Sequence, residues 1–298
     1  MSDNTDQIAN LQPPGGNPLQ KHFRQPKIYL RLPSGGKYWA KGSLDLPENG
    51  EVPVFAMTAK DEIVMKTPDA LMNGQSTVDV IQSCIPAIKD GWQCPSIDLD
   101  AILVAIRIAT FGEKITVKGK VPNTDMEKEF DLNLRTLLDQ YLAMEYQDVI
   151  QAEEFLVQVQ PMNYKQFTQI ATKTFEEQRV LSIVNDNTIS EAEKLDRFSK
   201  TFKNITALNV TMISDSITAI QYKDEDPVTN KQHIREFIEN ADSSVFNIIK
   251  SHVEQLRDRF TSQPIDVEAT PEEIEAGAPA KYQVPMQFDH SNFFVSGS

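Results

Sequence analysis

The sequence is poor in cysteine and histidine, and it has no long apolar run. Its 298 residues include two cysteines, Cys84 and Cys94, and four histidines. Two thiols cannot form the disulfide framework of a small secreted domain, and Cys94 has no second ligand at the spacing of a zinc site. The longest apolar run, 102–109, contains Arg107 and is far shorter than the roughly 20 residues that span a bilayer. We therefore expect no disulfide framework, no bound metal and no membrane-spanning helix.

Basic residues are also scarce. Lys and Arg number 29 against 43 Asp and Glu, which gives a formal net charge of -14. A surface with this charge repels nucleic acid and anionic lipid, because their phosphate groups find too few cations to neutralise them. Residues 1–6 lack the basic and apolar parts of a secretory signal peptide. The composition therefore favours a soluble protein of a reducing cytoplasm that binds neither nucleic acid nor membrane.

Residues that could perform catalysis do not group into a known pattern. A serine nucleophile needs a turn such as Gly-x-Ser-x-Gly, and a phosphate loop needs spaced glycines followed by lysine; the sequence has neither. His233 and Glu236 lie one helical turn apart, an arrangement more typical of a solvated helix face. The adjacent carboxylates Glu176 and Glu177 point apart on a helix. We predict no catalytic, cofactor-binding or metal-binding residue; an enzyme whose site is assembled from distant residues is the alternative of another class.

Apolar residues make up 40% of the chain, enough for a core, and they follow two periodicities. Residues 115–121 and 126–132 alternate with period two around a polar turn, which predicts a β-hairpin over 115–132. Apolar residues of 99–110 follow helical spacing on most of the helix surface, which predicts the central helix of the core. From 163 to about 260 the pattern indicates helices only. The predicted fold class is α+β.

These patterns divide the chain into segments of different character. An α+β half precedes a helical half, and a C-terminal strand returns to pack on one of them. The predicted segments are a flexible arm at 1–26, an α+β domain at 27–160, a helical domain at 161–262, an acidic linker at 263–281, and a C-terminal strand with an aromatic tail at 282–298.

Four features are suited to contacts with other proteins: the arm before Pro26, an edge strand containing Pro53, a long helix from Ser190, and the aromatic tail. Ser190 and Glu193 have the spacing of a capping box, and about 25 helical residues form a rod of roughly 35–40 Å. The apolar stripe of this long helix is more typical of a core than of an interface, although part of the rod can extend beyond the core. The tail is expected to pair with a sheet edge in its own subunit or a neighbouring one. The stripe consists of Leu195, Phe198, Phe202, Ile205, Leu208 and Met212.

Several segments together are similar to a known family. The most specific is 54–62, Val-Phe-Ala-Met-Thr-Ala-Lys-Asp-Glu; the others are 30–39, 81–85, 100–107, 111–112 and 284–294. Through them the chain resembles the baseplate hub proteins of T-even-type contractile-tailed bacteriophages, the phage base plate protein family. Relatives often carry Cys-x-x-Cys knuckles at the hairpin turn or before the closing strand. This chain has Pro-Asn-Thr-Asp and Pro-Ala-Lys there, at 122–125 and 279–281, so it resembles the family without those metal ligands.

The resemblance implies a late viral protein that builds the hub of the tail baseplate by protein–protein contacts. It is compatible with a structural component of the virion, with an assembly factor that leaves, and with a chaperone for the tape-measure protein that is absent from the mature virion. The implied partners are other hub or tail proteins, including the tape-measure protein, and a homo-oligomer is left open. The implied locations are the host cytoplasm during assembly and the virion baseplate.

Overall fold

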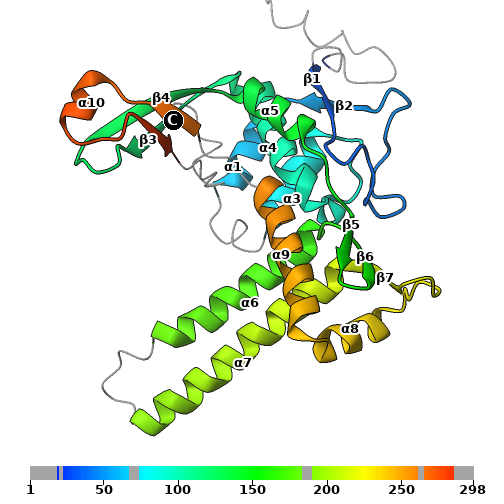
Figure 1. Cartoon of the computed structure of the whole chain (residues 1–298). Helices are drawn as coiled ribbons and strands as arrows, with labels where there is room; N and C mark the ends of the chain where they lie inside the picture. Colours follow the sequence, from blue (N-terminus) through cyan, green and yellow to red (C-terminus); the bar gives the residue numbers. More distant parts are fainter. Residues whose placement is uncertain (1–18, 20–22, 67–73, 183–189, 261–264, 285–298) are drawn as a thin grey trace, which may run out of the picture.

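Helices alternate with small antiparallel sheets along the chain (Figure 1). The computed structural model describes residues 19, 23–66, 74–182, 190–260 and 265–284. In this part of the chain lie three two-stranded sheets and one three-stranded sheet. Their side chains pack into three separate cores. The α+β class predicted from the sequence is confirmed.

The first core is built around helix α4, Ser96–Phe111. Its sequence is apolar on nearly every side, so the helix packs against neighbours in several directions, and Ile102 and Ile106 are fully buried. This is the central helix that the sequence predicts. Around it lie β1 Pro26–Arg31, β2 Glu51–Phe55, α1 Ala59–Met65, α3 Gln75–Cys84, the short 3-10 helix η2 Gly91–Gln93 and α5 Leu134–Ala143.

The second core contains a strand where the sequence predicts only helices. β7, Ile217–Tyr222, follows directly on α7 and pairs antiparallel with β6. The expectation of helices alone over 163–260 is therefore wrong. Isoleucine and threonine in this segment favour strand, and pairing satisfies backbone groups at the edge of β6 that would otherwise lack partners. This core is formed by β5 Val149–Ala152, β6 Phe155–Val159, α6 Tyr164–Ser182, α7 Glu191–Ser216, β7, α8 Lys231–Asn240 and α9 Ser243–Phe260.

The predicted β-hairpin is confirmed, because β3, Lys114–Lys120, pairs antiparallel with β4, Glu127–Asn133. Near it lie β8, Ile265–Glu268, and β9, Lys281–Val284, which form another antiparallel pair (Figure 1). Side chains from both pairs make the third core. The C-terminal strand thus pairs within its own chain, while the aromatic tail at 285–298 lies outside the described residues.

The segment 263–281, predicted as an acidic linker, contains β8 and the short helix α10, Pro271–Glu275. Thr270 and Glu273 form a capping box, in which each side chain accepts a hydrogen bond from the backbone N–H of the other. Pro271 stands in the first turn, where its missing N–H has no helical partner to lose. One of the carboxylates that indicated a linker therefore stabilises a helix start. The predicted domain limits stay predictions.

Candidate interaction surfaces

Helices α6 and α7 form a hairpin that projects away from the other elements (Figure 1). α7 is capped as the sequence predicts: Ser190 Oγ accepts a hydrogen bond from Glu193 N at 3.3 Å. Its 26 residues correspond to a length of about 39 Å. Asn204 Nδ2 of α7 donates to Glu177 Oε1 of α6 at 2.7 Å, which ties the two antiparallel helices together. The hairpin is therefore a defined rod.

The apolar stripe of α7 is buried only toward its C-terminal end. Met212 lies in the second core, whereas Leu195 is 68% exposed, Phe198 38% and Phe202 50%. The sequence favours core for the whole stripe, and for these three residues that is wrong. The physical reason is length, because the first turns of α7 extend beyond the elements that could cover them. The expectation that part of the rod leaves the core is confirmed.

Exposed aromatic residues also occur on α6, and they lie on the same side of the hairpin. Residues of the two helices face each other along the rows that contain Glu177 and Asn204. From these rows, the exposed apolar residues of both helices are rotated in the same sense by roughly 80° to 180°, with Leu195 at the outer edge of the range. Because the helices are antiparallel, equal rotations bring both sets to one side. This side, called the apolar face below, consists of Phe167, Phe175, Leu195, Phe198 and Phe202.

The hairpin carries no net charge, in contrast to the chain as a whole. Residues 164–216 contain seven Lys or Arg and seven Asp or Glu, so the formal charge of -14 rests entirely on the remainder of the chain. On the apolar face the rings of Phe198 and Phe202 contact each other, with centroids 4.7 Å apart. The hairpin therefore presents an aromatic-rich surface on a rod without net charge.

The N-terminal arm is fastened next to β1 by Arg24. Its Nη1 donates to Ala56 O, and its Nη2 donates to the carbonyl and hydroxyl oxygens of Ser83. Nη1 also lies 3.4 Å from Asp61 Oδ2. A planar guanidinium held by oxygens on two sides has a defined orientation. The arm predicted at 1–26 is thus fixed at Arg24, and most of it lies outside the described residues.

The loop between β1 and β2 joins the first core to the second. Asp98 of α4 accepts hydrogen bonds from Ser34 N at 2.7 Å, Ser34 Oγ at 2.5 Å and Trp39 Nε1 at 2.8 Å. Burial raises the pKa of Asp98 to about 6, and these hydrogen bonds oppose the rise. At the other end of the loop, Lys37 Nζ lies 2.6 Å from Asp148 Oδ2 beside β5, and this contact lowers the pKa of Asp148. One loop therefore contacts elements of both cores.

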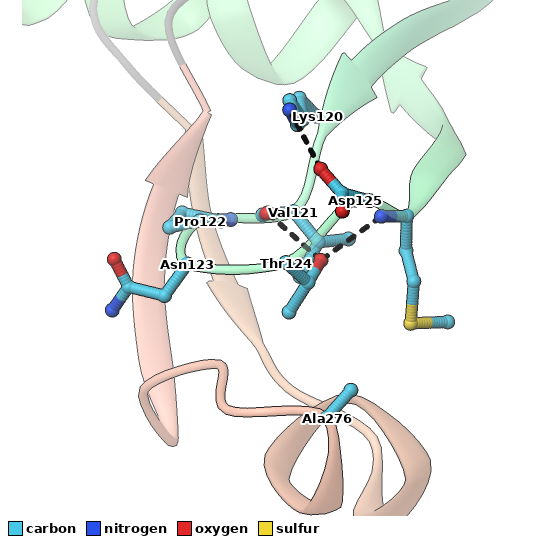
Figure 2. A pocket seen from close by; sticks show the side chains of 8 residues that line it. Lys120, Val121, Pro122, Asn123, Thr124, Asp125 and Ala276 are labelled. Carbon is cyan, nitrogen blue, oxygen red and sulfur yellow. Dashed lines mark hydrogen bonds and ion pairs between the residues drawn. The ribbon is translucent and has the colours of Figure 1, made fainter.

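The turn of the β3–β4 hairpin lines a pocket together with the end of α10 (Figure 2). Thr124 closes the turn, since its Oγ1 donates to Val121 O at 3.0 Å and accepts from Met126 N at 3.1 Å. Lys120 Nζ lies 3.4 Å from Asp125 Oδ1. The lining has no thiolate or imidazole that would suit zinc. It consists of Lys120, Val121, Pro122, Asn123, Thr124, Asp125, Met126 and Ala276.

One protein-family model matches most of the chain, including residues of all three cores. The family model described as T4 bacteriophage base plate protein matches residues 26–269, from β1 through β8. This chain belongs to that family. The resemblance seen in the sequence is thereby confirmed at the level of the family. No curated protein and no solved structure matches the chain.

The two thiols of this baseplate protein lie in the first core. Burial raises the pKa of Cys84 to about 12 and raises the pKa of Cys94 well above its usual value. Such thiols stay protonated at neutral pH and are poor nucleophiles and poor metal ligands. His233 and Glu236 are exposed on α8. That the protein has no catalytic residue stays a prediction.

Two further findings concern the described residues alone. Among them, no three side chains of His, Cys, Asp or Glu lie together in a group that could hold a metal ion. None of the helices described is both long enough and apolar enough to cross a membrane.

Purified protein is expected to contain no stoichiometric zinc, because 122–125 and 279–281 contain neither cysteine nor histidine. The third core is held instead by packing and by the contact of Lys128 Nζ with Glu273 Oε1 at 2.7 Å. Elemental analysis of protein purified without chelator measures the metal content. One zinc ion per chain would contradict the prediction, and so would a melting temperature that falls on addition of EDTA.

Proposed function

We propose that this protein is a structural or assembly component of the phage tail baseplate hub and that it acts through contacts with other tail proteins. Membership of the base plate protein family supports this role. The observation that carries the contact mode is the apolar face, because exposed apolar patches on folded proteins mark interaction sites. Covering one such phenylalanine stabilises a complex by about 1.5–3 kcal/mol at most, so five large side chains provide a substantial driving force.

A free strand edge offers a second means of contact. β1 and β2 form a sheet of two strands in the described part of the chain, so each has one edge without a strand partner there. In this pair Pro53 of β2 stands opposite Tyr29 of β1. Pro53 has no N–H to donate, which blunts the β2 edge, whereas Tyr29 is 59% exposed. The edge strand predicted at Pro53 is confirmed for the described part of the chain.

Two alternatives from the sequence remain distinguishable by experiment. A chaperone for the tape-measure protein would use the same kind of surface but would be absent from purified virions, so mass spectrometry of particles separates it from a hub component. An enzyme needs polar groups that converge in a pocket with shifted pKa values. The pocket at the β3–β4 turn is lined without a nucleophile beside a base, so it does not favour that alternative.

Co-expression with hub and tape-measure proteins of the same genome, followed by pull-down at moderate salt, tests the proposed function. At least one of these proteins is expected to co-purify. A variant with Phe198→Glu and Phe202→Glu places two carboxylates on the apolar face and shows whether the face takes part. The matched control, Gln169→Glu with Thr172→Glu, adds the same charge to exposed positions of α6 off that face.

Equal melting temperatures of both variants and the wild-type chain would show that the fold is intact. If no tail protein co-purifies, and the purified chain turns over a metabolite, the proposed function fails and the enzyme alternative replaces it.

A further inference from the structure

We propose that the apolar face is covered by a second copy of this chain, with the two α6–α7 hairpins packed antiparallel as a four-helix bundle. The inference rests on the proposed function only in treating this face as a docking surface. A symmetric contact uses the same surface on both copies, so the surface must be complementary to itself. An exposed apolar side of a helical hairpin meets that condition, because apolar side chains pack against copies of themselves.

The distribution of charge favours a second copy at the hairpin. Each chain carries -14, and two such chains repel each other when their charged parts approach. Residues 164–216 are neutral in sum, so two hairpins approach without this repulsion. A strongly basic partner would gain nothing at the hairpin and would be attracted to the remainder of the chain. A partner that is itself neutral at the contact, as a second hairpin is, is therefore favoured.

The side chains around the face strengthen this conclusion. The described residues that lie between its aromatic groups on the same side of the hairpin are uncharged: Ala171, Thr206 and Asn209. Lys173 and Lys200 lie on the other side, whereas Lys194, next to Leu195, borders the apolar face at the start of α7. Between the aromatic groups, two copies that meet through their apolar faces therefore bring no like charges together.

Antiparallel packing also separates the acidic parts. α7 is about 39 Å long, so two hairpins that overlap along their length place the remaining parts of the chains at opposite ends of the bundle. At physiological ionic strength the Debye length is about 8 Å, and charges much farther apart than this are screened. A parallel arrangement would place the two acidic parts side by side. The antiparallel one is therefore favoured.

The size of the face indicates a weak dimer. A buried aromatic side chain covers about 150–250 Å², so five partly exposed side chains give on the order of 500 Å² per copy. Stable complexes bury about 800 Å² per partner, and smaller contacts belong to transient ones. The dimer is expected to dissociate on dilution.

Sedimentation of the full chain alone, from about 1 µM to about 200 µM, tests the inference. The weight-average mass is expected to rise with concentration toward twice the monomer mass. Raising the salt concentration should leave the association unchanged or strengthen it, because the contact is apolar and the remaining parts repel. The Phe198→Glu and Phe202→Glu variant is expected to stay monomeric, while the Gln169→Glu and Thr172→Glu control associates like wild type.

The outcomes separate the inference from the proposed function. A wild-type chain that stays monomeric throughout overturns the inference, as does association that survives in the face variant. If the chain is monomeric and a tail protein co-purifies with wild type but not with the face variant, that protein covers the face; the function stands and the dimer fails. If the dimer forms, no tail protein co-purifies and the chain turns over a metabolite, the dimer stands and the function fails.

Discussion

Replacing Asp98 with asparagine is expected to destabilise the protein by about 1–3 kcal/mol, although the two side chains have nearly the same shape. In the native structure Oδ1 accepts from Ser34 N, and Oδ2 accepts from both Ser34 Oγ and Trp39 Nε1. An amide has one acceptor oxygen and one donor nitrogen. Whichever way the amide turns, its NH₂ faces either Ser34 N–H or Trp39 Nε1–H. One donor then loses its acceptor.

Asp98→Ala should cost more, because it removes the acceptor from all three donors and leaves a space beside α4. The whole loop that joins the two cores depends on this carboxyl, since Lys37 reaches Asp148 from the same loop. Urea unfolding at pH 7.5 measures the change in the free energy of unfolding for both variants. If Asp98→Asn unfolds at the wild-type urea concentration, the hydrogen bonds to Asp98 do not stabilise the fold as argued.

Asp100 provides the matched control on the same helix. Burial raises its pKa to about 7, and no described residue donates a hydrogen bond to it. Asparagine at this position removes a charge that has no partner and leaves no donor unsatisfied. Asp100→Asn is therefore expected to be neutral or stabilising at pH 8. A loss of stability as large as that of Asp98→Asn would contradict the reasoning for both residues.

The raised pKa values of Asp98 and Asp100 also predict how stability depends on pH. Both carboxyls have a folded-state pKa above the value of about 3.9 for an exposed aspartate, at about 6 for Asp98 and about 7 for Asp100. Between pH 4 and these values the native state binds more protons than the unfolded state. The contribution of these two groups to stability therefore falls as pH rises through that window and is constant above it. In the Asp100→Asn variant, the part of this decrease in stability that comes from Asp100 should be absent.

Local pattern explains which elements were predictable. The β3–β4 hairpin alternates over two adjacent segments, and α4 is apolar on nearly every side, so neighbours in sequence suffice to identify both. β7 is different, because its partner β6 lies far away in the chain. Within 163–260 helical spacing dominates on both sides of it. A strand whose main evidence is a distant edge is missed by any reading of local periodicity.

The contacts that hold the interaction surfaces in place were missed for the same reason. Arg24 contacts Asp61 and Ser83, and Asp98 accepts hydrogen bonds from the loop before β2. Glu273 accepts a hydrogen bond from Lys128, which lies 145 residues away in the sequence. No local pattern marks these residues. Of the apolar face, the sequence identified the α7 stripe but not which of its residues are exposed, since periodicity gives the side of a helix and not what covers it.

Removal of residues 282–298 is expected to unfold the third core and to lower the melting temperature or abolish assembly. The truncation deletes most of β9, which leaves β8 without its strand partner. It also removes Tyr282, which is 6% exposed and packs edge to face on Phe130 with ring centroids 6.4 Å apart. Burial of such an aromatic side chain stabilises by about 1.5–3 kcal/mol. Isolated two-stranded sheets are marginal in water, so neither pair is expected to persist alone.

Electrostatics adds to this packing. The Glu273 carboxylate caps α10, lies 2.7 Å from Lys128 Nζ and accepts a longer hydrogen bond from Tyr282 Oη at 3.4 Å. The hydrogen bond from Lys128 lowers the pKa of Glu273 most. Its ionised form is therefore favoured by folding, and this contribution is lost as pH falls through the lowered folded-state pKa. Without Tyr282 the carboxylate loses a partner and gains water.

Two truncations separate β9 from the residues that follow it. A chain that ends after Val284 keeps β9, and it should retain slow hydrogen exchange at Val121 and Phe130. A chain that ends after Lys281 should lose that protection, because the side chains that cover β4 are gone. Pull-down with the hub proteins shows whether either truncation prevents assembly. If the shorter chain keeps the wild-type melting temperature, amide protection and partners, β9 neither closes the third core nor supports assembly, and the residues after it have no role in either.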